Sequence, residues 1–195
     1  FTITSVGYSK KIIYRNQCNA NNDIYVTGNL GDSFIGLQVL KNKIKLNKSK
    51  TKYFINKYYM PDIQNKFSKN LLSLATSSMD ISDGLITDLN KLINKQNFSY
   101  KIYEKFIPVS RNLNNLINSR NLKKMDLVSN GDDYQILFTA KPNKARIINK
   151  LSKSLGVKIS KIGTILSGKN KSLILDQKGR EIANNVSGYV HQFWS

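Results

Sequence analysis

Apolar residues recur along the chain at the spacings of strands and helices. The segment 23–27 (DIYVT) is β-branched and aromatic and is followed by a glycine, so it predicts a buried strand. The opening residues, FTITSV, alternate like a strand already under way, which indicates a fragment whose N-terminal neighbour is absent. Further strands are predicted at 78–81, 98–103, 135–139, 157–165 and 172–175, with a turn at 177–179 after the last.

Five segments have the apolar spacing of helices. Four of these are predicted at 62–75, 84–95, 108–118 and 143–155, and Pro108 opens the third. The remaining helix follows Gly31-Asp32-Ser33, which offers caps, and it carries Phe34, Leu37 and Leu40 on one face. The stretch 41–58, rich in Lys, Asn and Tyr, is expected to be a mobile surface segment.

The alternation of helices and strands places the chain in the α+β (mixed α/β) class. Several strands are spaced like hairpins, so we expect a sheet covered by helices that pack over one face. Residues 21–195 are expected to form one domain, and 1–20 the end of a preceding domain and its linker. No stretch approaches the roughly 18 apolar residues of a membrane helix, and no secretory signal pattern follows the first residues.

Composition adds a formal net charge of +19. Such a charge points to nucleic acid or another polyanion. However, the lysines are spread over the chain, and aromatic residues do not alternate with them as a stacking platform requires. We therefore favour compositional drift, and a basic nucleic-acid-binding module is kept only as an alternative. The single cysteine, Cys18, excludes an internal disulfide and fits a reducing cytoplasm.

Acidic residues number only 12, so their grouping is informative. In MDISDG (79–84), Asp80 ends a predicted strand, and Ser82 and Asp83 begin a predicted helix. Phosphate oxygens bind at helix N-termini, and carboxylates at such a corner can hold Mg²⁺. The alternative is that Ser82 and Asp83 only cap the helix, which leaves Asp80 unexplained. The residues alone do not separate these two interpretations.

Two further clusters are weaker. SNGDDY (129–134) has the composition of an ordinary turn. GNLGDS (28–33) could cradle a phosphate, but it lacks the lysine and spacing of a P-loop, so close backbone packing with a helix cap is favoured. The single histidine, His191, cannot form a histidine-based zinc site, and no Gly-x-Ser-x-Gly elbow supports a catalytic triad.

Taken in order, these clusters resemble the C-terminal part of the thiamine-monophosphate kinase family, within the aminoimidazole ribotide synthetase-like superfamily. The resemblance runs from about Ser5 to the C-terminus, and the family's N-terminal domain is missing from this chain. Four segments carry it: IYVTGNLGDSFIGL (24–37), SMDISDGLITDL (78–89), NGDDYQILFT (130–139) and GYVHQF (188–193).

The resemblance implies direct transfer of the γ-phosphoryl group of ATP to thiamine monophosphate, giving thiamine diphosphate without a covalent enzyme intermediate. Several Mg²⁺ ions would neutralise the triphosphate. In this family the N-terminal domain carries further metal-binding aspartates and forms the homodimer. We therefore expect a cytoplasmic enzyme whose C-terminal part is inactive alone.

Six residues take family roles by position. They are Asp80 and Asp83 as Mg²⁺ ligands, Arg15 and Ser82 as ATP contacts, and Asp132 and Tyr189 as contacts to the thiamine moiety. A cationic thiazolium beside an acid and an aromatic face is physically reasonable.

Three positions depart from the family pattern. Asn130 replaces the first glycine of a Gly-Gly pair, although Asn can adopt left-handed dihedrals. Asp132 is one methylene shorter than the usual Glu, and Gln135 replaces a Glu and loses its charge. Another enzyme of the superfamily, such as aminoimidazole ribotide synthetase or a selenophosphate synthetase, and a degenerate paralogue stay open as alternatives.

Overall fold

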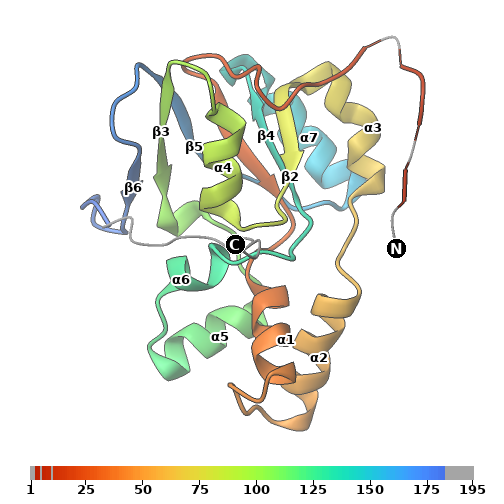
Figure 1. Ribbon diagram of the computed structural model, residues 1–195, viewed down its shortest axis with the longest axis vertical. Coiled ribbons are helices and arrows are strands. Elements are labelled where there is room, and N and C mark those ends of the chain that lie inside the picture. Colours follow the sequence, from red (N-terminus) through yellow and green to blue (C-terminus); the bar gives the residue numbers. More distant parts are fainter. Residues whose placement is uncertain (1–2, 5, 10, 183–195) are drawn as a thin grey trace, which may run out of the picture.

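The computed structural model describes residues 3–4, 6–9 and 11–182. Tyr189 and His191, on which two of the interpretations above depend, lie outside these residues. The described residues form a sheet in the order β2-β4-β1-β5-β3-β6 (Figure 1). Neighbouring strands are antiparallel except β3 and β6, which run parallel. The strands are β1 (Asp23–Thr27), β2 (Ala75–Asp80), β3 (Phe98–Tyr103), β4 (Ile136–Ala140), β5 (Ile159–Ser167) and β6 (Leu173–Leu175).

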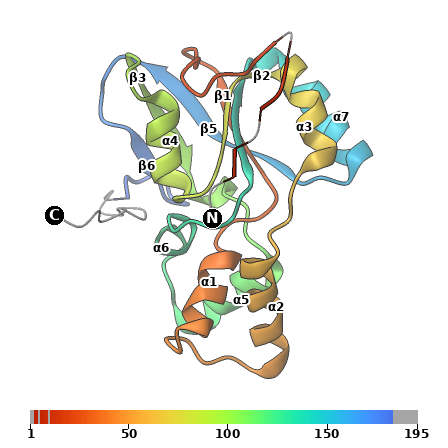
Figure 2. The same cartoon turned by 45° about the vertical axis from the view of Figure 1, so that its right-hand side comes forward.

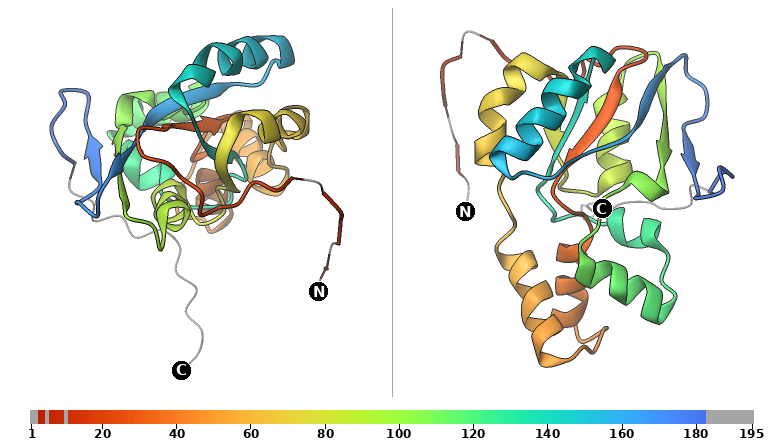
Figure 3. Two further views of the ribbon diagram at one scale, coloured as in Figure 1. Left: turned by 90° about the horizontal axis from the view of Figure 1, so that it is seen from above. Right: turned by 180° about the vertical axis from the view of Figure 1, so that it is seen from behind.

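Helices lie on both faces of the sheet and beyond one of its ends. In Figures 1 and 3, α4 covers one face, α3 and α7 cover the other, and α1, α2, α5 and α6 form a separate layer past the end of β1. The helices are α1 (Asp32–Leu40), α2 (Lys48–Tyr59), α3 (Asn65–Leu74), α4 (Leu85–Ile93), α5 (Arg111–Arg120), α6 (Lys124–Val128) and α7 (Ala145–Leu155). Within the described part of the chain, no helix is long and apolar enough to cross a membrane.

The two faces of the sheet have separate cores because side chains alternate along each strand. Ile24 and Val26 of β1 pack with the apolar stripe of α4. Tyr25, between them, stacks on Phe138 of β4 at 5.2 Å, and Phe67 of α3 lies 5.4 Å from the same ring. The expectation that helices pack over one face is therefore wrong, because the central strands are apolar on both faces.

The stretch 41–58, which we expected to be mobile, contains most of α2. This helix begins at Asn47, whose side chain accepts a hydrogen bond from Lys50 N at 2.9 Å. Phe54 is fully buried against Ile35 of α1. A Cβ at Gly36 would lie 2.2 Å from the Phe54 carbonyl oxygen, so α1 and α2 pack at backbone distance. The sequence did not reveal this buried face, because lysines and asparagines dominate the segment.

Other boundaries differ by a few residues. The strands predicted at 23–27 and 98–103 are confirmed. Helix α5 begins after Ser110, whose hydroxyl accepts from Leu113 N at 3.0 Å, and not at Pro108. Helix α3 begins at Asn65, which leaves Ile63 60% exposed. Residues 3, 4 and 6 of FTITSV are not in a strand, and the short helix α6 had no prediction.

Replacing the cap of α2 tests whether this helix is a stable part of the fold. We expect Asn47→Ala to lower the free energy of unfolding by about 1 kcal/mol, because it removes the acceptor for one helix N–H group. Urea unfolding would measure the change. Asn115→Ala, at an exposed position within α5, is the matched control and should cost nothing. Equal stability of the two variants would show that α2 contributes little.

Candidate functional site

The three acidic clusters meet at one end of the sheet. Strand β2 leads into residues 81–84, and β4 follows residues 129–135, so antiparallel pairing of the two strands brings these loops together. The pairing continues past the strands: Ile81 N donates to Gln135 O at 2.9 Å, Tyr134 N to Ile81 O at 2.9 Å, and Asp132 N to Ser82 O at 3.0 Å. Strand β1 ends beside them and leads through 28–31 into α1 (Figure 2).

Two glycines permit the close approach of these loops. A Cβ at Gly131 would lie 1.8 Å from Ser82 O, and a Cβ at Gly84 would lie 2.0 Å from Ser129 O. Real Cβ atoms do not come this close to backbone oxygens, so a side chain at either position would push the loops apart. Gly84 also has a φ of 107°, which favours glycine.

A pocket of about 750 Å³ opens between these loops and the helices below them. Ser82 and Asp83 line it from one loop, and Asn130, Gly131, Asp132 and Tyr134 from the other. Helix α1 contributes Phe34, Leu37 and Gln38, Lys41 follows at its C-terminal end, and α2 contributes Tyr58. The wall therefore combines carboxylates, the Ser82 hydroxyl, a lysine and three aromatic rings.

The face of α1 that we predicted from spacing serves this pocket more than the core. The buried residues of the helix are Asp32, Ser33, Ile35 and Gly36, whereas Phe34, Leu37 and Leu40 are only partly covered. Apolar spacing alone does not distinguish a pocket wall from a core face.

Ser82 and Asp83 do not cap α4, so the capping interpretation is wrong. The helix has Gly84 at its N-cap without a side-chain cap hydrogen bond. Instead, the buried Asp88 carboxylate accepts from Ser82 N and Asp83 N, both at 2.9 Å. The side chains of Ser82 and Asp83 are therefore not used as caps, and both residues line the pocket. Asp88 lies in the first turn of α4, where an acid interacts favourably with the helix N-terminus. The sequence analysis did not use this signal.

Lys91 balances the charge of this loop. Its ammonium group forms ion pairs with Asp83 and, at 2.8 Å, with Asp88. Burial lowers the pKa of Lys91, but the hydrogen bonds to Asp83 and Asp88 outweigh it, so the pKa lies above its usual value. The lysine is therefore positively charged at neutral pH.

Asp80 lies at the exposed end of β2, two residues before Ser82, and is not among the residues that line the pocket. Burial of the Tyr134 ring, together with the charges of Asp132 and Asp80, raises the pKa of Tyr134, which indicates that these groups lie close together. Among the described residues, no group of three or more His, Cys, Asp or Glu side chains is placed to hold a metal. Asp80 and Asp83 nevertheless fit Mg²⁺, which often uses one or two carboxylates and completes its shell with phosphate oxygens and water.

Of the remaining predicted residues, some line this pocket and others do not. Asp132 lines it in a left-handed conformation (φ 68°), and the Tyr134 hydroxyl donates to its Oδ1 at 3.5 Å. Arg15 lines a separate cavity of about 260 Å³, which includes Lys91. Lys91 therefore lines the same cavity as Arg15 and also forms an ion pair with Asp83. Asn130, for which left-handed dihedrals were considered, does not adopt them.

Asp133 is buried behind the pocket and organises the start of α1. Its Oδ2 accepts from Gly31 N at 2.8 Å. Burial raises the pKa of Asp133 to about 8, and the charge of the nearby Asp32 acts in the same direction. Burial also raises the pKa of Asp32, although Ser110 and Tyr53 hydroxyls donate to its carboxylate at 2.7 and 2.9 Å. The GNLGDS cluster is thus a tight backbone turn, but the helix cap expected with it is not formed by a side chain of the cluster, because Gly31 is the N-cap of α1 and makes no side-chain cap hydrogen bond.

The structure explains why residue 135 is a neutral Gln and not the Glu of the family pattern. Its Oε1 accepts from Thr27 Oγ1 and Gln64 Nε2, both at 3.0 Å, and its Nε2 donates to Asp62 O at 3.1 Å. A carboxylate could not donate the last bond. Gly28 leaves room for this amide, because a Cβ there would lie 2.2 Å from Oε1.

Comparison with known proteins places this geometry in context. The family described as "AIR synthase related protein, C-terminal domain" matches residues 19–176. The thiamine-monophosphate kinase of Buchnera aphidicola (subsp. Schizaphis graminum) is 32% identical over 183 residues, covering 93% of this chain and 56% of that protein. The Escherichia coli K12 thiamine-monophosphate kinase is 29% identical, covering 86% and 51%. The chain therefore spans little more than half the length of these relatives.

Solved structures share the fold. Thiamine-monophosphate kinase from Stenotrophomonas maltophilia K279a superimposes with a TM-score of 0.73 at 23% identity, covering 87% of this chain and 54% of that one. AaThiL complexed with AMPPCP and TMP gives the same TM-score and identity, covering 90% and 53%. At this identity the likeness supports the fold alone.

The contact between the two loops can be tested with one added methyl group. We expect Gly131→Ala to destabilise the fold by about 1–3 kcal/mol, because the new Cβ meets the backbone oxygen of Ser82 and the loop must shift. Gly7→Ala adds the same methyl where nothing lies within 4 Å, so its stability should not change. Urea unfolding of both variants decides the matter, and equal stability would contradict the steric argument.

The buried acid predicts a pH dependence of stability. Folded Asp133 keeps its proton up to about pH 8, whereas the unfolded chain loses it near the ordinary value of 3.8. Its contribution is therefore fully present below about pH 4 and is lost as the pH rises toward 8. Asp133→Asn should weaken this decline, because the amide is neutral and can still accept from Gly31 N.

Urea unfolding at about pH 5 and about pH 8 would measure the effect. Asp126→Asn, on the exposed surface of α6, is the matched control and should keep the wild-type slope. The same slope in Asp133→Asn as in the control would show that Asp133 is ionised in the folded chain.

Proposed function

This chain belongs to the AIR synthase related proteins through their C-terminal domain, and on that premise we propose that it is the C-terminal part of a kinase that phosphorylates thiamine monophosphate with ATP. The product is thiamine diphosphate. One observation carries the proposal: the pocket gathers Ser82, Asp83 and Asp132 from segments about 50 residues apart in sequence. The names of the relatives and the complex of AaThiL with AMPPCP and TMP support the choice of substrates.

The loop after β2 is the phosphate side of the proposed site. Asp80 and Asp83 would hold Mg²⁺, which neutralises phosphate charge as the phosphoryl group moves. The Ser82 hydroxyl, which lines the pocket, would donate to a phosphate oxygen. Asp88 accepts the backbone N–H groups of Ser82 and Asp83, so it fixes the loop and leaves the side chains to the ligands.

Lys91 has a second role in this scheme. It pairs with Asp83, so a metal ion at Asp83 requires the ammonium group to withdraw. Because Lys91 also lines the cavity that contains Arg15, it can turn toward that cavity. Arg15 and Lys91 then provide two positive charges for the ATP phosphates.

The opposite wall of the pocket suits the thiamine moiety. Asp132 supplies a negative charge for the cationic thiazolium, and the rings of Phe34 and Tyr58 supply apolar and aromatic surface. Asp132, which has a left-handed backbone conformation, would take the place of the family's Glu. We assign Tyr189 to the same moiety on sequence position alone, since it lies outside the described residues.

The upstream half of the relatives is required for the complete reaction. We propose that it supplies further metal-binding aspartates and the homodimer contact, that the enzyme is cytoplasmic, and that residues 21–195 form the C-terminal domain. The chain spans 56% and 51% of two of its relatives. Turnover by the 195-residue chain alone would contradict this division of roles.

A kinase assay on the full-length protein tests the function. Wild type should convert ATP and thiamine monophosphate to thiamine diphosphate with Mg²⁺, and Asp83→Asn should lower kcat by about 100-fold or more, because charge stabilisation in the transition state is lost. Asp132→Ala should mainly raise KM for thiamine monophosphate. Chromatographic measurement of the product distinguishes these effects.

Asp126→Asn is the control, since this exposed acid does not line the pocket. It should retain wild-type kcat and KM. A folded wild type that binds ATP but forms no thiamine diphosphate would refute the proposed substrate and favour a sister enzyme of the superfamily.

A further inference from the structure

A second concave region of the chain is strongly cationic. This cavity, the Lys124 pocket, has a volume of about 690 Å³ and lies where the segment 105–111 meets α6 and β5. None of the described residues that line it is acidic, and none lines the pocket of the proposed kinase site. Five of its lining residues are basic: Lys105, Arg111, Lys124, Lys158 and Lys161.

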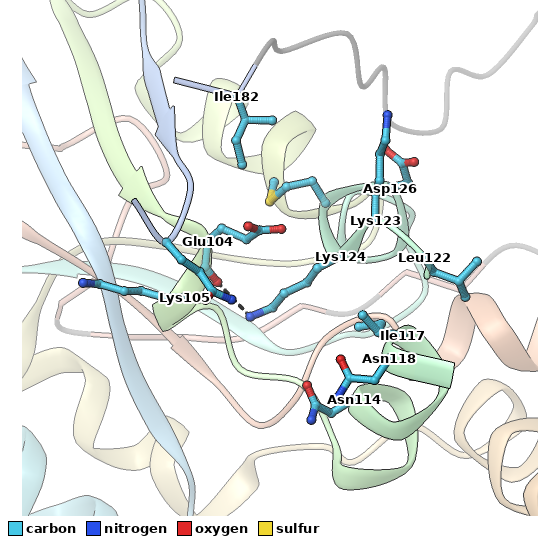
Figure 4. Close-up of a pocket in the computed structure, with 12 residues that line it drawn as sticks. Glu104, Lys105, Asn114, Ile117, Asn118, Leu122, Lys123, Lys124, Asp126 and Ile182 are labelled. Atoms are coloured by element: carbon cyan, nitrogen blue, oxygen red, sulfur yellow. Dashed lines mark hydrogen bonds between the residues drawn. The ribbon is translucent and has the colours of Figure 1, made fainter. Parts of the chain in front are cut away.

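Lys124 lies at the centre of this charge. Figure 4 shows it reaching from α6 toward the 3-10 turn Glu104–Phe106, with Lys105 and Asn114 nearby, and its Nζ donates to Glu104 O at 2.7 Å. The three residues Lys105, Asn114 and Lys124 also line the neighbouring cavity of about 800 Å³ drawn there. Burial lowers the pKa of Lys124, and the charge of Lys158 adds to this against the opposite pull of Glu104. An anion in the pocket would relieve the repulsion.

Neighbouring groups hold the other cations in place. Lys158 Nζ donates to Asn29 Oδ1 at 2.7 Å, and Lys161 pairs with Asp23 at 2.6 Å. Arg111 occupies the first turn of α5, and both Ser110 and Arg111 line the same cavity. Phosphate oxygens are suitable partners for such an arrangement.

Phe106 adds an aromatic surface to the same pocket. The residue is 48% exposed, and its ring packs at a steep angle against Tyr103, with centroids 5.6 Å apart. The Lys105 ammonium lies 4.9 Å from the ring centroid. An exposed ring held beside phosphate-binding cations is the arrangement on which nucleobases stack. The linear sequence does not reveal it, because the cations come from three separate segments.

We propose that the Lys124 pocket binds a nucleoside phosphate. Its phosphate contacts Arg111, Lys124 and Lys158, and its base stacks on Phe106. The ligand chemistry is shared by free nucleotides and by single-stranded nucleic acid, toward which a formal net charge of +19 would attract the chain. This site is separate from the proposed kinase pocket and does not depend on kinase activity.

Two fluorescent probes test the proposal and distinguish the sources. Binding of mant-ADP and of a fluorescein-labelled ten-nucleotide oligothymidylate is measured on the whole protein in EDTA, at about physiological salt, so that magnesium-dependent binding does not contribute. Phe106→Ala should weaken the better probe by about 10-fold. Arg111→Gln/Lys158→Gln should weaken it at least as much. Whichever probe binds more tightly identifies the source.

A matched pair of exposed lysines on α7 provides the control. Lys150→Gln/Lys153→Gln removes the same charge elsewhere and should alter affinity less than about 2-fold. An equal loss in the α7 control would show diffuse attraction, and wild-type affinity in Phe106→Ala would exclude base stacking; either result, or the absence of binding by both probes, overturns the proposal.

Discussion

The approach of two backbone segments, 81–84 and 129–131, is the constraint on which the site depends. The Cβ-free positions Gly84 and Gly131 allow each loop to contact the other's carbonyl oxygen. The hydrogen bonds that extend the β2–β4 pairing then hold the loops in register. Because the side chains of Ser82, Asp83 and Asp132 project from these loops into one pocket, their relative positions follow from the backbone contact and require few side-chain interactions.

Buried carboxylates complete this arrangement from within. Asp88 binds the amides that open α4, and Asp133 binds the amide that opens α1. Each acid thus replaces a capping side chain, so the pocket-facing residues do not have to cap the helices. Burying Asp133 beside Asp32 raises the pKa of both groups, so the site is built at some cost to stability at neutral pH.

The sequence predicted the fold class, two strands to the residue and all three clusters that converge here. It did so because period-two and helical spacings are local, and because acidic residues are rare in this chain. It could not predict that helices cover both faces, since that depends on the face of the sheet against which α3 and α7 pack. It also missed α2, Asp88 and the burial of Asp133, because their partners lie on other segments or behind a surface rich in lysine and asparagine.

The position of β2 at the edge of the sheet has a consequence for the behaviour of the protein in solution. An unpaired strand edge is a template for association with other chains. This edge reads ATSSMD (75–80), with small polar residues and a terminal carboxylate, and the opposite edge, β6, has only three residues. Within the described residues, neither edge offers the long apolar strand on which aggregates grow, so the sheet gives little support to edge-to-edge association with other chains.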